Sequence, residues 1–215
     1  MILLIAATSL EIQPTIDWIE KQGLSSKITI LISGIGTPAT MYSTMKTIVS
    51  QQPELIIQAG IAGSFNTSIK IGDVVIAKSE QWCDLGIEDH EQFRTIFDMH
   101  FTNPNAQPYD CGEIQCNSPD IKSIKNLQKV KAITTNTTHG NRISIEKIVQ
   151  KFNPHIESME GAAVAYICAM EHIHFLEIRS ISNLVEPRNK KAWNISLAIE
   201  NLNKELQKII NEITL

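Results

Sequence analysis

The sequence predicts an α/β fold: a three-layer sandwich with a central, mostly parallel or mixed sheet and helices on both faces. Short apolar segments rich in β-branched residues alternate with segments of helical period along most of the chain. The 215 residues, 43% hydrophobic and 20% charged, have the size and composition of one globular domain spanning 1–215. No repeat, low-complexity tract or linker divides them.

The first expected strand is the apolar run MILLIAA at 1–7, which is followed by a helical pattern over 9–20 that Gly23 stops. The segment KITILIS at 27–33 predicts a second strand that ends at a glycine turn. Thr37 is expected to cap the next helix, over 39–50, because Pro38 would then occupy the first helical position.

Four further buried strands are expected at 55–58, 74–78, 130–134 and 175–181, and three further helices at 144–151, 161–170 and from 190 to the C-terminus. The last helix has one apolar stripe, which predicts packing on the sheet. Its members are Ile195, Ile199, Leu202, Leu206, Ile209 and Ile213. Segment 81–116 is rich in Asp, Asn, Pro and His and is expected to be a long irregular excursion.

Composition excludes several classes of protein. With 19 basic and 23 acidic residues, and no block of like charge, a grip on a nucleic-acid backbone is not expected. The four cysteines and six histidines have no metal-ligand spacing, so free thiols and no metal are expected. The apolar start lacks a basic segment and no run approaches the ~20 residues of a membrane span. A cytoplasmic protein without membrane partners is the expectation.

Ligand sites in open α/β sheets form beyond the carboxyl ends of the strands. Two carboxylates, Glu11 and Glu160, and the amide of Asn183 follow predicted strands. Each also has a purely structural explanation, since acids suit helix N-termini and Asn suits turns. The glycines of GIG and GIAG lack the dinucleotide spacing and the P-loop lysine, and alone they indicate tight turns.

Five motifs in order, SGIG before a Pro/Ala helix, AGIAGSF, IGDVVIA, SMEGAAVA and RSISN, together resemble the nucleoside phosphorylase and nucleosidase superfamily. The resemblance covers nearly the whole chain, and SMEGAA with RSIS about twenty residues later is its most specific part. Within the superfamily, WCDLGIED, FRTIFD, NTTHG and SNLVEPRNKKAWN look most like the futalosine hydrolases. These are related to the methylthioadenosine/S-adenosylhomocysteine nucleosidases.

The resemblance implies a nucleoside phosphorylase-like sandwich that acts on an N-ribosyl bond without a metal or organic cofactor. It implies that Glu11 activates water, that Glu160 binds the ribose hydroxyls, and that Arg179 lies near both. Asn183 stands where adenine-specific nucleosidases have an acid. The other expected substrate-binding residues are Ile61, Ala62, Gly63, Thr138, His139, Ser158, Met159, Ser182, Arg188 and Trp193.

Relatives are homodimers whose partner closes the pocket at the 5′ end of the ribose, so a homodimer or a higher homo-oligomer is expected. Apolar groups for such a contact are Trp82, Phe93, Phe97 and Phe101. Trp193 matches a position that lines this pocket, and the planar fork of Arg188 suits the benzoate that futalosine carries there. A solvated helix start explains Arg188 equally well.

The chemistry needs these residue types for independent reasons. Breaking the glycosidic bond builds positive charge on the ribose and negative charge on the purine, so a carboxylate and a donor are needed. A phosphate acceptor would need charge-assisted donors. Residues 58–60 contain no basic residue and the first loop offers Glu11, so water is the expected acceptor.

Three hypotheses about function follow, all with a small-molecule nucleoside as ligand. The first is hydrolysis of futalosine to hypoxanthine and dehypoxanthine futalosine in menaquinone biosynthesis. The second is an adenine-releasing nucleosidase, which Asn183 discriminates from the first. The third is a non-catalytic nucleoside-binding relative, since fold does not fix function. The presence of Glu11, Glu160 and Arg179 argues against the third.

Overall fold

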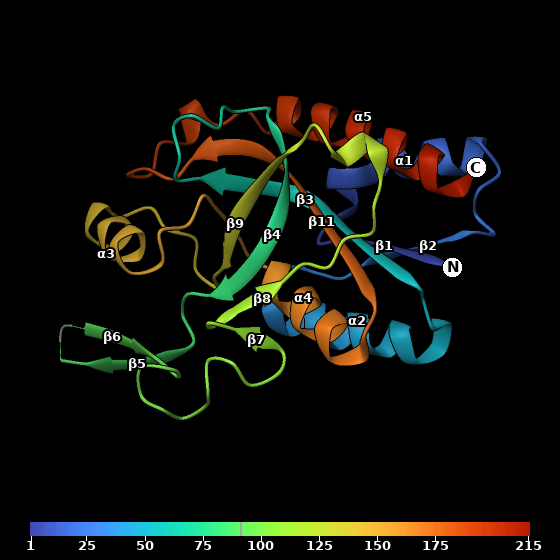
Figure 1. Ribbon diagram of the computed structural model, residues 1–215. Coiled ribbons are helices and arrows are strands. Elements are labelled where there is room, and N and C mark those ends of the chain that lie inside the picture. The colour runs from blue at the N-terminus through green and yellow to red at the C-terminus, as the bar shows by residue number, and fades with distance from the viewer. Residues whose placement is uncertain (91) are drawn as a thin grey trace.

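The protein, in a computed structural model that describes residues 1–90 and 92–215, is built in three layers around a mixed sheet (Figure 1). The strands are β1 (Ile2–Ala6), β2 (Ile28–Ile32), β3 (Leu55–Ser64), β4 (Val74–Trp82), β5 (Gly86–Asp89), β6 (Gln92–Thr95), β7 (Tyr109–Asp110), β8 (Glu113–Gln115), β9 (Gln128–Thr134), β10 (Ile156–Ser158) and β11 (His174–Leu184). All but β5 and β6, which form a separate hairpin, belong to the sheet.

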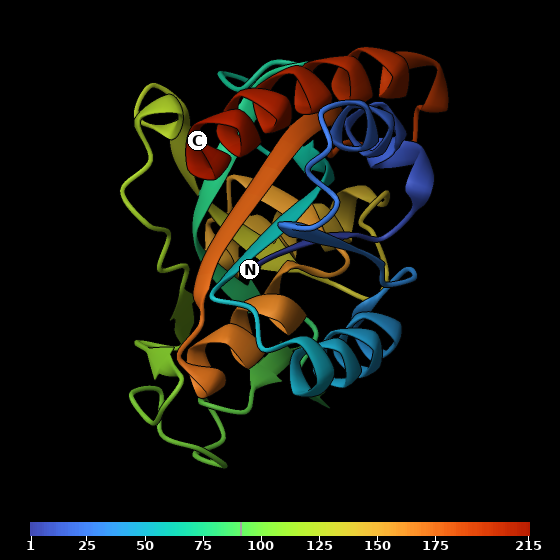
Figure 2. The ribbon, with the colours of Figure 1, turned by 90° about the vertical axis from the view of Figure 1, so that its right-hand side faces the viewer.

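Helices α1 (Ser9–Lys21) and α5 (Ile195–Thr214) cover one face of the sheet, and α2 (Thr37–Gln51) and α4 (Gly161–Glu171) cover the other (Figure 2). Helix α3 (Arg142–Phe152) lies at one end (Figure 1). Alternate residues of β1 enter the two cores, Leu4 on the α1 and α5 side and Leu3 on the α2 and α4 side. The predicted three-layer fold is therefore confirmed.

Three members of the apolar stripe predicted on α5 pack on the sheet. Leu202, Leu206 and Ile209 are fully buried against the sheet, as predicted.

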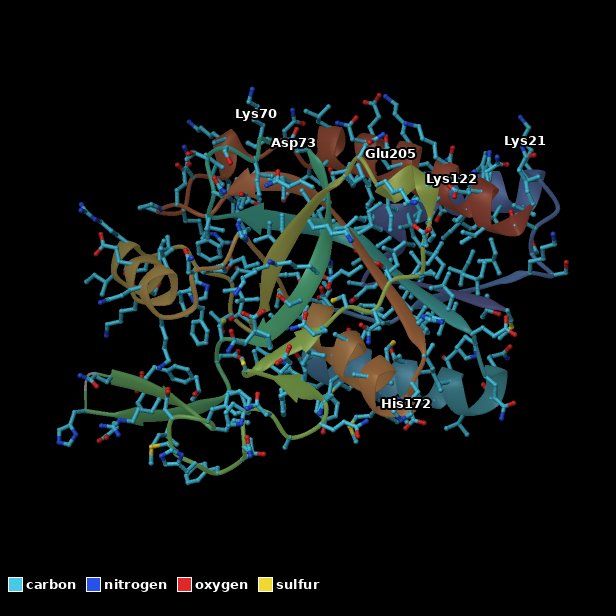
Figure 3. The ribbon with its side chains drawn as sticks, viewed as in Figure 1. Lys21, Lys70, Asp73, Lys122, His172 and Glu205 are labelled. Atoms are coloured by element: carbon cyan, nitrogen blue, oxygen red, sulfur yellow. The ribbon has the colours of Figure 1, made fainter. Side chains whose placement is uncertain are left out.

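Charged side chains such as Lys21 and Lys70 point away from the molecule (Figure 3). No helix among the residues described is long and apolar enough to cross a membrane. All four cysteines are free thiols.

The sheet also closes on itself, which the sequence did not predict. Strand β11 bonds to both β3 and β4, so that β3, β10, β9, β4 and β11 pair in a closed circuit. Ala62, Val130 and Ile181 fill its interior. The glycine-rich segment 59–64 lies inside β3 and residues 180–184 lie inside β11, so the predictions that both follow their strands are wrong.

Two predicted helix starts are corrected. Gly36, not Thr37, is the N-cap residue of α2, with Pro38 in the first turn as predicted. Gly36 has a φ of 85°, which favours glycine, and its N–H is held by Glu160. The helix predicted from residue 190 begins instead at Ile195 after the short 3₁₀ turn η2 (Lys190–Ala192), because the Asn194 side chain accepts from the Leu197 N–H.

Segment 81–116 is more ordered than predicted, and much of its apolar surface packs on this chain. It contains the β5–β6 hairpin and the paired strands β7 and β8. Phe97 packs edge-on against Tyr109 with ring centres 4.9 Å apart, and Phe93 lies 6.4 Å from Phe152. Phe101 is the member of the predicted contact set that stays exposed, at 67%. The short strands β5–β8 and β10, and the 3₁₀ turn η1 (Lys122–Ile124), escaped prediction.

Candidate active site

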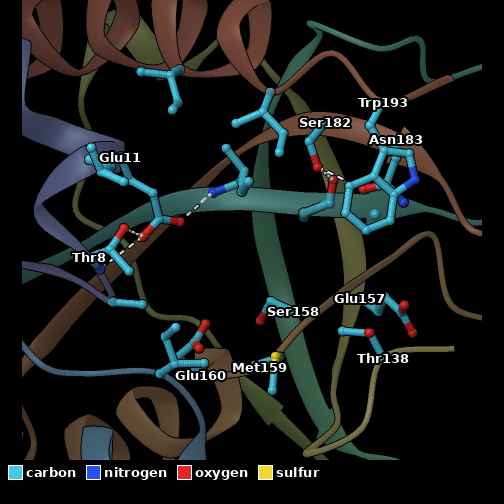
Figure 4. Close-up of a pocket in the computed structure, with 18 residues that line it drawn as sticks. Thr8, Glu11, Thr138, Glu157, Ser158, Met159, Glu160, Ser182, Asn183 and Trp193 are labelled. Carbon is cyan, nitrogen blue, oxygen red and sulfur yellow. Dashed lines mark hydrogen bonds between the residues drawn. The ribbon is translucent and has the colours of Figure 1, made fainter. Parts of the chain in front are cut away.

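A cavity of about 450 Å³ lies where α1, the start of α5 and the ends of β3, β10 and β11 meet (Figure 4). Eleven residues predicted at the site line it: Glu11, Ile61, Ala62, Gly63, Thr138, Ser158, Met159, Glu160, Ser182, Asn183 and Trp193. Seven lining residues were not predicted: Ala7, Thr8, Leu10, Ile35, Glu157, Ile195 and Ile199. The fold thus gathers parts of the chain as far apart in sequence as Ala7 and Ile199.

Glu11 is fixed by both of its carboxylate oxygens. Its Oε2 accepts from the backbone N–H and the hydroxyl of Thr8, each at 3.0 Å, and its Oε1 accepts from the Ile61 N–H at 3.1 Å (Figure 4). Thr8 is the N-cap of α1, so the acid also serves the helix N-terminus. The same carboxylate also lines the cavity.

Glu160 is the N-cap residue of α4 and is 5% exposed. Its Oε1 accepts from the Gly36 N–H at 2.9 Å, and its Oε2 lies 3.8 Å from Nη1 of Arg179. Burial raises the pKa of Glu160, Arg179 and the Gly36 N–H oppose that rise, and Glu11 adds to it. The result is a partly desolvated acid at the cavity wall.

Arg179 does not line the cavity but lies behind it, 2% exposed on β11. Its Nε donates to Glu177 at 2.8 Å. Burial acts to lower the pKa of Arg179, but Glu177 and Glu160 outweigh it and raise the pKa, so the guanidinium stays charged. This cation therefore lies between the carboxylates of Glu160 and Glu177.

Gly60 allows this arrangement. A Cβ atom at Gly60 would lie 2.5 Å from Nη1 of Arg179 and 2.9 Å from Oε1 of Glu11. Any side chain at this position of β3 would displace one of the two groups. The glycine is therefore required for close approach, whereas the sequence had indicated a tight turn.

A second buried pair of acids, Glu80 and Glu177, supports Arg179. Both side chains are fully buried, and Glu80 accepts a hydrogen bond from the Thr134 hydroxyl at 2.9 Å. Burial and the nearby Glu177 raise the pKa of Glu80 well above its ordinary value. The segments KSEQW and FLEIR, each with an acid inside an apolar strand, were the overlooked signal.

Glu80→Gln should make thermal stability less dependent on pH. In the folded wild type the raised pKa of Glu80 contributes stability that is complete below the unfolded pKa and is lost as pH rises towards the folded pKa. Glutamine does not titrate, so the Tm of the variant relative to wild type should rise between about pH 5 and pH 8. Thermal scans across this range test it, and a Tm difference that does not vary with pH would contradict it.

The amide of Asn183 presents a donor to the cavity. Its Oδ1 accepts from the Ser182 hydroxyl at 2.7 Å (Figure 4). Its Nδ2 donates to the Leu184 carbonyl at 2.9 Å. A flipped amide would set Oδ1 against that carbonyl, so the orientation is fixed. Nδ2 carries a second hydrogen besides the one bonded to Leu184. The bulge in β11 between Ile181 and Asn183 aims the side chain, as bulges near sites do.

Two other predicted residues do not line the cavity. The ring Nδ1 of His139 lies 2.6 Å from a carboxylate oxygen of Glu157, which does line it. The guanidinium carbon of Arg188 lies 5.4 Å from the ring centre of Trp193, beside the cavity wall. His139 therefore stands behind the wall, whereas Arg188 is exposed beside it.

The wall of the cavity is acidic. Across residues 1–90 and 92–215 it includes Glu11, Glu157 and Glu160 but no Lys, Arg or His. Within the same part of the chain, no group of three or more His, Cys, Asp or Glu side chains is placed to hold a metal ion. An anion such as phosphate that lay between Glu11, Glu157 and Glu160 would meet three acids.

The chain belongs to the Phosphorylase superfamily, whose family model matches residues 22–214. It is 25% identical over 189 residues to a futalosine hydrolase of Streptomyces coelicolor, covering 84% of this chain and 77% of that protein. It is 28% identical over 192 residues to a 5′-methylthioadenosine/S-adenosylhomocysteine nucleosidase of Buchnera aphidicola, covering 82% and 74%. The solved futalosine hydrolase of Helicobacter pylori has the same fold, with a TM-score of 0.80 at 18% identity over 98% of this chain and 97% of that one.

Proposed function

We propose that this protein is a nucleosidase that hydrolyses the N-ribosyl bond of futalosine and releases hypoxanthine. The observation that carries the proposal is a cavity wall with two fixed acids, Glu11 and Glu160, and no basic side chain among the described residues that line it. Such a wall favours water over phosphate as the acceptor. The two named relatives are similarly distant in sequence, at 25% and 28% identity, so the choice of futalosine as substrate rests on the residues of the site.

In the proposed reaction Glu160 accepts hydrogen bonds from the ribose hydroxyls. As the bond between C1′ and the purine breaks, positive charge develops on the ribose ring. A carboxylate held in place by Gly36 and steadied by Arg179 stabilises that charge without first reorganising. Ser158 and Met159 line the cavity beside it.

Glu11 is the general base for the attacking water. Thr8 and Ile61 hold both carboxylate oxygens, so the acid can take the proton of a water at a defined position. The oxygen of that water bonds to C1′ and the purine leaves with the bonding electrons. The amide N–H of Asn183 then donates to N7 or O6 of the leaving base, where negative charge collects.

Asn183 supports hypoxanthine over adenine. Hypoxanthine presents acceptors at both N7 and O6, which suit the free N–H of the fixed amide. Adenine presents a 6-amino donor, which would face another donor. A mismatched buried donor costs about 1–3 kcal/mol, or roughly one to two powers of ten in rate.

The apolar part of the cavity wall supports a substrate with an aromatic acid at its 5′ side. Trp193 lines the cavity with Leu10, Ile35 and Ile195, and the Arg188 guanidinium stacks over the Trp193 ring. The benzoate of futalosine offers a ring for this wall and a carboxylate for Arg188. An adenine-releasing activity on methylthioadenosine is the second candidate, because the same apolar wall would accept a methylthio group.

We also propose a homodimer in which the partner covers the apolar part of the cavity wall. Leu10 and Ile35 at the cavity are 76% and 62% exposed, and the neighbouring helix α2 carries Tyr42 and Val49 at 70% and 74%. Leu10, Ile35, Tyr42 and Val49 are exposed apolar side chains that such a partner would cover.

Asn183→Asp should invert the choice of base. An ionised aspartate offers no hydrogen to N7 or O6, whereas a protonated one can serve N7 and accept from a 6-amino group. We expect kcat/KM for futalosine to fall by roughly 10- to 100-fold, with some gain for its 6-amino analogue. Chromatography of the released base measures both, with Asn66→Asp, on a turn away from the cavity, as control. Equal losses on both substrates would remove Asn183 from base recognition.

A further inference from the structure

Glu157, which the sequence analysis did not select, lies across Gly63 from Asn183. Gly63 of β3 pairs with Glu157 of β10 on one side and with Asn183 of β11 on the other. A Cβ atom at Gly63 would lie 3.2 Å from Nδ2 of Asn183 and 3.5 Å from Cγ of Glu157. All three residues line the cavity. A fixed donor and a carboxylate therefore flank the same glycine.

His139 holds that carboxylate in one orientation. The His139 N–H donates to Oε1 of Glu157 at 3.1 Å, and the ring Nδ1 lies 2.6 Å from Oε2. The two side chains are 5% and 11% exposed, Glu157 being the more buried. Each carboxylate oxygen can accept more than one hydrogen bond, so the pair leaves acceptor capacity towards the cavity. A buried acid with a fixed partner and a spare acceptor is suited to recognising a donor.

We infer that Glu157, positioned by His139, accepts a hydrogen bond from the ring N1–H of a 6-oxopurine and so determines base specificity together with Asn183. The inference rests on the proposed function, because it names the group that would recognise the leaving base. A 6-oxopurine carries an acceptor at O6 and a donor at N1 on neighbouring atoms. The amide N–H and the carboxylate on either side of Gly63 form the complementary pair.

Adenine would be mismatched at both positions. Its 6-amino group would face the N–H of Asn183, and its N1 lone pair would face the Glu157 carboxylate. A site built to pair a donor rejects an analogue that lacks it more strongly than an apolar wall would. Two mismatches therefore make the selection sharper than Asn183 alone could.

The first test is Glu157→Gln, assayed with futalosine and its 6-amino analogue. The neutral amide can donate to the N1 of adenine, so the ratio of the two kcat/KM values should fall by about 10- to 100-fold, mostly through loss on futalosine. Glu113→Gln is the matched control, since Glu113 is a half-buried strand acid bonded to Lys131 outside the cavity. An unchanged ratio, or an equal loss on both substrates, would show that Glu157 only supports the fold.

The second test needs no variant and so survives a Glu157→Gln protein that fails to fold. Hypoxanthine should bind the wild type about 10-fold or more tightly than 1-methylhypoxanthine, which lacks the N1 hydrogen, when measured by calorimetry. Equal affinities would overturn the role of Glu157. Failure of the proposed function looks different, because the wild-type enzyme would then prefer the 6-amino analogue to futalosine.

Discussion

Glu11→Gln should lower kcat on futalosine by roughly 10²–10⁴-fold and leave nucleoside binding nearly unchanged. Glutamine keeps the size of the side chain, and its one carbonyl oxygen can still accept from Thr8 or from Ile61, but it cannot take a proton from water. A loss confined to kcat identifies a group that acts in the transition state and not in substrate binding.

Single-turnover kinetics together with calorimetric binding of the nucleoside separate the two effects. Glu20→Gln, an exposed acid near the end of the same helix, should behave like the wild type. Turnover by Glu11→Gln at the wild-type rate would mean that another group activates the water.

Glu160→Gln should lower kcat/KM by roughly 10²–10³-fold, and both binding and turnover should suffer. Glutamine retains an acceptor for the Gly36 N–H but removes the negative charge that faces the ribose. It also leaves Arg179 with less compensation in a buried site, because that guanidinium lies 3.8 Å from the Glu160 carboxylate.

Steady-state kinetics with the free base as a separate ligand give the test for Glu160. The substitution should weaken nucleoside binding but leave the affinity for free hypoxanthine nearly intact, since Glu160 is proposed to touch only the sugar. Glu171→Gln, at the other end of α4, is the control. A variant with normal kcat/KM would rule out the role.

The strands and helices that the sequence predicted are those with a clear apolar period. The run at 1–7 and the α5 stripe are examples, because burial of one or two faces of an element sets the spacing of its apolar residues along the sequence. The closed circuit of strands left no such signal. It depends on β11 bonding both β3 and β4, a long-range pairing between segments whose glycines and polar residues resemble turns.

The same reason separates the site residues that the sequence predicted from those it missed. Glu11, Glu160 and Asn183 stood out because they interrupt apolar segments within recognisable motifs, and all three line the cavity. Glu157 stood beside them in ESMEG, but its importance comes from pairing opposite Gly63, which spacing does not record. Arg179, predicted near the water and the ribose, lies 3.8 Å from Glu160 and donates to Glu177, but it does not line the cavity itself.

The proposed hydrolysis of futalosine is tested most directly by identifying the base that the pure protein releases in phosphate-free buffer. Futalosine, methylthioadenosine and inosine are supplied separately, and the products are identified by chromatography over time. We predict that hypoxanthine appears fastest from futalosine and that added phosphate changes neither the rate nor the sugar product. Adenine released from methylthioadenosine as fast as hypoxanthine from futalosine, or release that requires phosphate, would contradict it.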